Sequence, residues 1–179
     1  MDRKGKYCIM SESIDKRAAN VVKLLSEKGM KAATAESCTG GLASAAITSV
    51  SGSSEVFEMG VCSYANRIKQ NVLGVSSEAL EKYGAVSEQV AKEMAQGVMK
   101  CADSDFGVST TGIAGPTGGT EEKPVGTVWI GVCSRESCRA ERFLFGTEGC
   151  PDNLTEREYI RQQAACKALE MLQGEIERF

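Results

Sequence analysis

Helix-like and strand-like segments alternate along nearly the whole chain, and this alternation limits the available folds more than any other feature. The apolar residues from Ile14 to Leu25 share one helical face, and Gly29 follows where a helix would end, so a first helix is expected over about 12–28. Later apolar segments and turn residues predict further strands and helices. The strands are expected over about 30–37, 56–65, 105–115, 125–134 and 138–145. The helices are expected over about 38–50 and 66–75, after Ser76, after Ser87 and over about 153–179.

The order of these segments predicts the fold class. A few polar residues separate the strands at 125–134 and 138–145, which indicates a hairpin. Alternating strands and helices with one hairpin predict an α/β protein, a three-layer α/β/α domain around a mixed sheet. Asn153 followed by Glu156 is typical of the start of the last helix. Residues 1–179 are expected to form a single domain, since a chain of this length can bury a core unaided.

Composition excludes several classes of protein. With 42% hydrophobic and 25% charged residues, the chain has the composition of a folded globular protein rather than a disordered one. The net charge of −3 and the lack of a Lys/Arg cluster argue against charge-driven nucleic-acid binding. No run of about 18 apolar residues and no signal-peptide pattern occur, so no membrane partner is predicted and a cytoplasmic location is expected.

The cysteines do not form a metal-binding pattern. The chain has eight cysteines and no histidine. No CxxC pair occurs, and mixed Cys/His zinc patterns are excluded. We therefore predict no metal site and expect mostly reduced thiols, several packed as small hydrophobes. The cysteines are Cys8, Cys38, Cys62, Cys101, Cys133, Cys138, Cys150 and Cys166.

The stretch TAESCTGGLASAAI, residues 34–47, carries the first candidate chemistry. Ser37 lies at a predicted strand-to-helix junction, where unpaired backbone N–H groups and the helix dipole can hold an oxyanion or a phosphate. Gly40 and Gly41 permit a tight bend and close approach of a ligand. The alternative is structural, with Ser37 or Thr39 capping the helix and the glycines easing its packing.

A nucleophilic Ser37 needs a base, and the chain has no histidine to supply one. Lys69 and Tyr64 in the stretch SYANRIKQ are candidates, because desolvation can lower the pKa of a lysine toward neutrality. The alternative is that Lys69 is a solvated surface residue, as most lysines are. Cys38 is a rival nucleophile, because it also lies near a helix N-terminus. The sequence favours a structural role for it, as a thiol packed under the turn.

Two further segments have ligand-binding features. The glycine-rich loop at 110–126 could hold a phosphate or ribose through its N–H groups, although it matches neither a Walker A sequence nor a GxGxxG fingerprint. The alternative is a surface loop. Arg157 and Arg161 lie four residues apart on one helical face, where they could reach a ligand phosphate or pair with internal carboxylates.

Five stretches in order, from about residue 14 to 172, resemble the nicotinamide-nucleotide amidase family, also known as the C-terminal domain of the competence/damage-inducible protein CinA. Five motifs in register are far more specific than any single glycine motif. These stretches are TAESCTGG, YANRIKQNVLGV, YGAVSEQVAKEMA, TTGIAGPTGGTEEKPVGTVWIGV and REYIRQQAACKAL.

The resemblance implies a three-layer α/β amidohydrolase that converts nicotinamide mononucleotide to nicotinic acid mononucleotide and ammonia, without a cofactor. It implies that Ser37 is the nucleophile and that Lys69, helped by Tyr64, removes its proton. Backbone N–H groups around Cys38 and Thr39 would stabilise the oxyanion. A homo-oligomer is expected, and the chain resembles the stand-alone form of the family, without the additional N-terminal domain of its longer members.

The resemblance also implies which residues bind the nucleotide. The final motif departs from the family's usual Gly-Asp-Arg start, reading Thr155-Glu156-Arg157, which affects the geometry expected around Arg157. The candidates for the phosphate and ribose are Gly40, Gly41, Gly115, Gly118, Gly119, and Arg157 or Arg161.

Two other functions remain open at this point. A non-catalytic nucleotide-binding or regulatory module would keep the fold without turnover, although the presence of Ser37, Tyr64 and Lys69 argues against this. A phosphate-transferring enzyme would explain the glycine loops, but the chain has no P-loop lysine motif and no evident acidic metal cluster.

Overall fold

The computed structural model describes residues 13–179, which form five strands, six α-helices and one short 3₁₀ helix. The elements in chain order are α1 (Ile14–Lys28), β1 (Ala32–Glu36), α2 (Leu42–Thr48), η1 (Ser53–Glu55), β2 (Phe57–Cys62), α3 (Asn66–Leu73), α4 (Ser77–Tyr83), α5 (Glu88–Cys101), β3 (Phe106–Gly112), β4 (Thr127–Ser134), β5 (Cys138–Leu144) and α6 (Glu156–Ile176).

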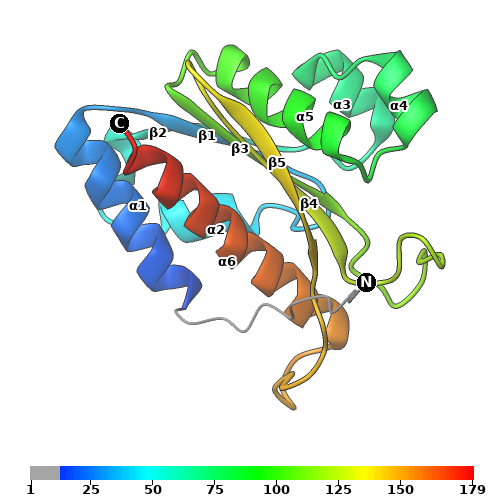
Figure 1. The fold of residues 1–179 in the computed structure, drawn as a ribbon. Coiled ribbons are helices and arrows are strands. Elements are labelled where there is room, and N and C mark those ends of the chain that lie inside the picture. Colours follow the sequence, from blue (N-terminus) through cyan, green and yellow to red (C-terminus); the bar gives the residue numbers. More distant parts are fainter. Residues whose placement is uncertain (1–12) are drawn as a thin grey trace.

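The strands form one mixed sheet in the order β2-β1-β3-β4-β5. β1 is parallel to β2 and β3, whereas β4 is antiparallel to β3 and β5. Helices α1, α2 and α6 cover one face of the sheet, and α3, α4 and α5 cover the other (Figure 1). The predicted α/β class, its three layers and the hairpin are confirmed. None of the helices in the described part is long and apolar enough to cross a membrane.

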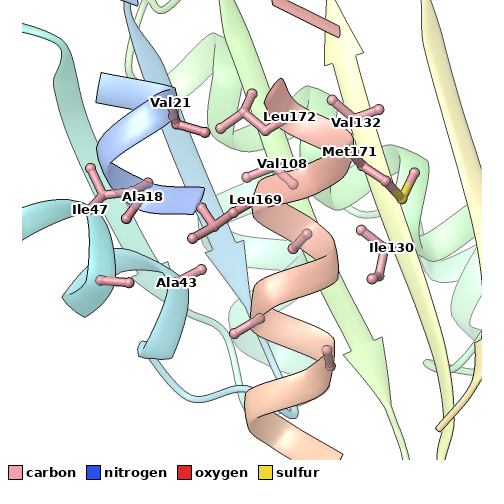
Figure 2. Packing of buried hydrophobic residues seen from close by; sticks show 14 of the residues in the cluster. Ala18, Val21, Ala43, Ile47, Val108, Ile130, Val132, Leu169, Met171 and Leu172 are labelled. Atoms are coloured by element: carbon pink, nitrogen blue, oxygen red, sulfur yellow. The ribbon is translucent and has the colours of Figure 1, made fainter. Parts of the chain in front are cut away.

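Each face of the sheet has its own apolar core. Strand β1 is buried along its whole length, and its successive residues point to opposite faces. Ala32 packs in the core beneath α1, α2 and α6, whereas Ala33 and Ala35 pack in the core beneath α5. Figure 2 shows the first core, where Leu169 and Leu172 of α6 lie among side chains from the other helices and the sheet. Burial on both faces fixes β1 in the middle of the protein.

Two predicted helix starts differ from the observed ones. The predicted helix over 38–50 is shorter in the structure, because residues 38–41 form a turn before α2 begins at Leu42. The prediction that the last helix starts from Asn153, with Glu156 three residues on, is wrong, because α6 begins at Glu156. Thr155 is the N-cap of α6, and it forms a reciprocal capping box with Glu158.

The structure contains a disulfide that cysteine spacing does not predict. Antiparallel pairing of β4 and β5 places Cys133 opposite Cys138 with their Cα atoms 4.0 Å apart, and the two form a disulfide. Cys38, Cys62 and Cys150 remain thiols. Cys8 lies outside the described residues.

Gly97 of α5 sets how closely this helix packs against α3, which carries Lys69. A Cβ at Gly97 would lie 1.9 Å from the carbonyl oxygen of Leu73, whereas a Cβ at Gly174 of α6 would meet nothing within 4 Å. We expect Gly97→Ala to lower the free energy of unfolding by about 1–3 kcal/mol or more through overpacking. Gly174→Ala should raise it by up to about 1 kcal/mol, because alanine favours the helix. Denaturant unfolding measures the free energy of unfolding of both variants. Changes of the same sign in Gly97→Ala and Gly174→Ala would contradict the close packing of α5 against α3.

Candidate active site

Three segments far apart in sequence meet at one edge of the sheet. Because β1, β2 and β3 are parallel, the residues that follow them leave the sheet at the same edge, a common place for ligand sites in α/β proteins. Ser37 follows β1, and its N–H donates to the carbonyl of Thr110 on β3 at 2.9 Å. Ser63 follows β2, and its N–H donates to the carbonyl of Glu36 at 2.8 Å. These backbone contacts fix the two turns relative to each other.

Lys69 of α3 reaches Ser37. Its Nζ lies 3.1 Å from the Oγ of Ser37, and the lysine is only 1% exposed. Nζ also donates to the carbonyl of Ser63 at 2.5 Å and to that of Tyr64 at 3.5 Å. The alternative that Lys69 is a solvated surface residue is therefore wrong. The fold of β2 and α3 turns this side chain into the protein.

Burial favours the neutral form of Lys69. Removal from water lowers the pKa of Lys69 below its ordinary value near 10.5. The contacts of Nζ suit an uncharged amine. Its two N–H groups can donate to the carbonyls of Ser63 and Tyr64, and its lone pair can then accept the hydroxyl proton of Ser37. Lys69 and Ser37 therefore have the geometry of a base and a nucleophile.

Cys38 has the character of a packed thiol. It is 6% exposed, and its burial raises the pKa of the thiol to about 12. A thiol with this pKa holds almost no thiolate at neutral pH, and the thiolate is the nucleophilic form. Ser37 is the better candidate nucleophile, because its hydroxyl lies within hydrogen-bond distance of the amine of Lys69.

Glu36 binds the N-terminus of α2, where the sequence predicted that an oxyanion or a phosphate could bind. Its carboxylate is buried and accepts four hydrogen bonds, from the N–H groups of Gly41, Ala43 and Ser44 and from the hydroxyl of Ser44. The start of α2 is thus satisfied from within the chain. Glu36 was missed at the sequence level, although a carboxylate just before a helical turn is the signal for such a contact.

The amides of Cys38 and Thr39 are arranged differently from those at the start of α2. Neither N–H donates a hydrogen bond to a backbone carbonyl within residues 13–179. The Thr39 side chain is buried, with its hydroxyl 2.7 Å from that of Thr110. Two backbone donors thus follow Ser37 without a backbone acceptor among the described residues.

A cavity of about 370 Å³ opens beside Ser37. Arg157 of α6 lies on its wall and donates to the carbonyl of Gly115 and, at 3.2 Å, to the hydroxyl of Tyr64. Tyr64 is 68% exposed, and it contacts Lys69 through its backbone carbonyl rather than through its phenol. The cavity is lined by Ser37, Cys38, Tyr64, Asn66, Lys69, Ala85, Val86, Thr111, Gly112, Ile113, Ala114, Gly115, Thr117, Gly118 and Arg157.

Several predicted binding residues lie outside this lining. Arg161 donates its guanidinium to the carbonyls of Cys38 and Thr39, and a Cβ at Gly40 would lie 3.1 Å from its Nη2. Gly119 packs against the backbone of Val125. The predicted site residues outside the lining are Thr39, Gly40, Gly41, Gly119 and Arg161. Asn66 and Thr111, which the sequence did not single out, belong to the lining.

Comparison with known proteins identifies the family of this chain. The sequence model of the CinA C-terminal domain matches residues 14–176. The chain belongs to this family. The resemblance noted in the sequence is therefore confirmed at the level of the CinA C-terminal domain.

CinA-like and competence/damage-inducible proteins resemble this chain in sequence, and two of their crystal structures resemble it in fold. A CinA-like protein of Nostoc sp. (strain PCC 7120) is 46% identical over 165 residues, which are 90% of this chain and 39% of that protein. The crystal structure of the competence/damage inducible protein CihA from Agrobacterium tumefaciens has a TM-score of 0.83 at 38% identity, covering 92% of this chain and 96% of that one. The competence damage-inducible protein A from Klebsiella pneumoniae has a TM-score of 0.85 at 30% identity, covering 94% and 99%. The chain spans only about 35–39% of the length of the curated relatives it matches.

Proposed function

We propose that this CinA-family chain is an amidohydrolase that converts nicotinamide mononucleotide to nicotinic acid mononucleotide and ammonia. The observation that carries the proposal is the buried Nζ of Lys69, 3.1 Å from the hydroxyl of Ser37 at the wall of a cavity. A neutral amine at this distance can act as a general base toward a serine. The family resemblance supplies the substrate.

The first half of the reaction transfers the acyl group to the enzyme. Lys69 takes the proton of Ser37 as Oγ bonds to the carboxamide carbon, and the carbonyl electron pair moves onto oxygen. The N–H groups of Cys38 and Thr39 stabilise this oxyanion. When the tetrahedral intermediate collapses, the C–N bond breaks and Lys69 gives its proton to the leaving nitrogen, which departs as ammonia.

The second half returns the enzyme to its starting state. A water molecule gives a proton to Lys69 as its oxygen attacks the ester carbon, and a second oxyanion forms in the same place. Collapse breaks the bond from carbon to the Oγ of Ser37, and Lys69 returns the proton to Oγ. The balance is one carboxamide and one water converted to one carboxylic acid and one ammonia.

The walls of the cavity provide groups for the nucleotide. Its volume of about 370 Å³ lies within the range of small-molecule sites. Arg157 supplies a guanidinium for the phosphate, and Gly115 and Gly118 let the loop after β3 approach a ligand closely. Tyr64 is held at the mouth by Arg157 and offers an aromatic ring to the substrate. Its help to Lys69 is supplied by its carbonyl.

The pH dependence of turnover follows from the lowered pKa of Lys69. Below that pKa the amine is protonated and cannot accept the proton of Ser37. We therefore expect kcat/KM to rise with pH and to level off as Lys69 loses its proton, with a midpoint below 10.5. A pH profile of kcat/KM between about 6 and 10 measures this. A profile that falls through this range would contradict Lys69 as the base.

Ammonia release from nicotinamide mononucleotide, measured in the presence of EDTA, tests the proposed function. The phosphate-free riboside is the matched control substrate, and we expect a higher KM for it because it cannot contact Arg157 through a phosphate. A wild type that binds the nucleotide without releasing ammonia would favour a binding or regulatory module. A strict Mg²⁺ requirement would favour phosphoryl chemistry instead.

A further inference from the structure

Two charged side chains hold the turn between β1 and α2 from opposite ends. Glu36 accepts the amides at the start of α2. Arg161 of α6 donates from Nε to the carbonyl of Cys38 at 3.1 Å and from Nη2 to the carbonyl of Thr39 at 2.8 Å. Arg161 does not line the cavity. Its guanidinium is therefore directed at the backbone of the turn rather than at a ligand.

The geometry of the peptide bond links these contacts to the N–H groups of the turn. In a planar trans peptide, the C=O and the N–H point in opposite directions. A Cys38 carbonyl held toward Arg161 therefore directs the N–H of Thr39 away from the guanidinium. The Thr39 carbonyl does the same for the N–H of Gly40. A cation at the carbonyl also polarises the peptide group, which makes its N–H a stronger donor.

Gly40 makes the close approach of Arg161 feasible. Its φ is +62°, a conformation that residues with a Cβ rarely adopt. A Cβ at this position would lie 3.1 Å from the Nη2 of Arg161 and would crowd the guanidinium. The glycine and the arginine thus fit one another on the side of the turn that faces α6.

We propose that Arg161 is a positioning residue that orients and polarises the peptide group between Cys38 and Thr39, whose N–H is one of the two oxyanion donors. It acts through the carbonyls of Cys38 and Thr39 and does not touch the substrate. Glu36 complements it, because its carboxylate takes up the amides at the start of α2 and leaves those of Cys38 and Thr39 for the reaction. This inference rests on the proposed amidase function.

Steady-state kinetics of Arg161→Met and Arg161→Lys test the inference. Since one lost oxyanion donor costs about 10²–10³-fold, we expect the misaligned Thr39 N–H in Arg161→Met to lower kcat by about 10–10²-fold while KM changes little. Arg161→Lys keeps the charge and can reach one carbonyl, so its kcat should be intermediate. Arg157→Met, one helical turn away, is the matched control and should mainly raise KM. Thermal melting of each variant shows whether it is folded.

Labelling of Ser37 by a fluorophosphonate probe separates this inference from the choice of substrate. The Oγ of Ser37 bonds to phosphorus as fluoride leaves and Lys69 takes the proton, and the P=O oxygen occupies the oxyanion position. We expect labelling, followed by intact mass, to be about tenfold or more slower in Arg161→Met than in the wild type.

Each outcome of the labelling is decisive. If the wild type is labelled but releases no ammonia from the nucleotide, slow labelling of Arg161→Met still supports the inference while the proposed substrate fails. Equal labelling rates of the wild type and Arg161→Met would overturn the inference alone. If Arg161→Met melts at a lower temperature, Arg161→Lys is used instead, and equal labelling of Arg161→Lys and the wild type would overturn the inference. A wild type that is not labelled at Ser37 would overturn both the inference and the proposed function.

Discussion

Lys69→Met should lower kcat by about 10²–10⁴-fold, the range expected for loss of a general base. Methionine keeps the apolar length of the side chain but cannot take the proton of Ser37. Among the described residues, Lys69 is the one side chain that hydrogen-bonds to the hydroxyl of Ser37, so no second base is at hand to replace it. Initial rates of ammonia release measure the effect.

Two controls separate lost chemistry from lost structure in this experiment. Lys69→Met leaves the carbonyl of Ser63 without this donor, so thermal melting is measured to show that the variant is folded. Lys100→Met makes the same exchange at an exposed position of α5 and should keep wild-type rates. Wild-type turnover by Lys69→Met would exclude Lys69 as the base.

The meeting of Ser37 with Lys69 could be predicted from the resemblance to the family but not from the residues alone. The local sequence pattern favours a surface position for a lysine on a short helix, because charged side chains are rarely buried. Only the parallel pairing of β1 with β2, followed by α3, brings Nζ to the turn after β1. Tertiary contacts of this kind leave no mark in the local pattern.

The two arginines of α6 show where spacing stops being informative. A separation of four residues places Arg157 and Arg161 on one helical face, and both were candidates for a phosphate. In the structure, Arg157 lies on the cavity wall while Arg161 contacts the carbonyls of the turn after Ser37. The two arginines are one helical turn apart and have different neighbours in the fold. The spacing in the sequence does not predict which neighbours each of them has.

The start of α6 shows a pattern that fits two positions. Asn153 with Glu156 and Thr155 with Glu158 both have a capping residue three positions before a glutamate, and the structure uses the second pair. Element types were predicted well because periodicity extends over many residues. Ends depend on single hydrogen bonds, and equivalent candidates two residues apart cannot be ranked from the pattern.

Ser37→Ala should remove turnover almost completely, by about 10⁴-fold or more, because no acyl-enzyme can form without its hydroxyl. Cys38 is the neighbouring residue that could replace it as nucleophile. Its burial and its pKa of about 12 keep the thiol protonated. Cys38→Ala therefore removes the rival nucleophile and should keep turnover within about tenfold of the wild type, since a thiol that is not ionised does not attack.

In the proposed function, Ser37 hydrolyses a carboxamide with Lys69 as its base. The most direct test is to measure ammonia and nicotinic acid mononucleotide formed from nicotinamide mononucleotide by the wild type, Ser37→Ala and Cys38→Ala, with EDTA present. We expect equal amounts of both products from the wild type, near-wild-type formation by Cys38→Ala and almost none by Ser37→Ala. Undiminished product formation by Ser37→Ala would contradict Ser37 as the nucleophile, and a wild type that forms neither product would contradict the amidase function.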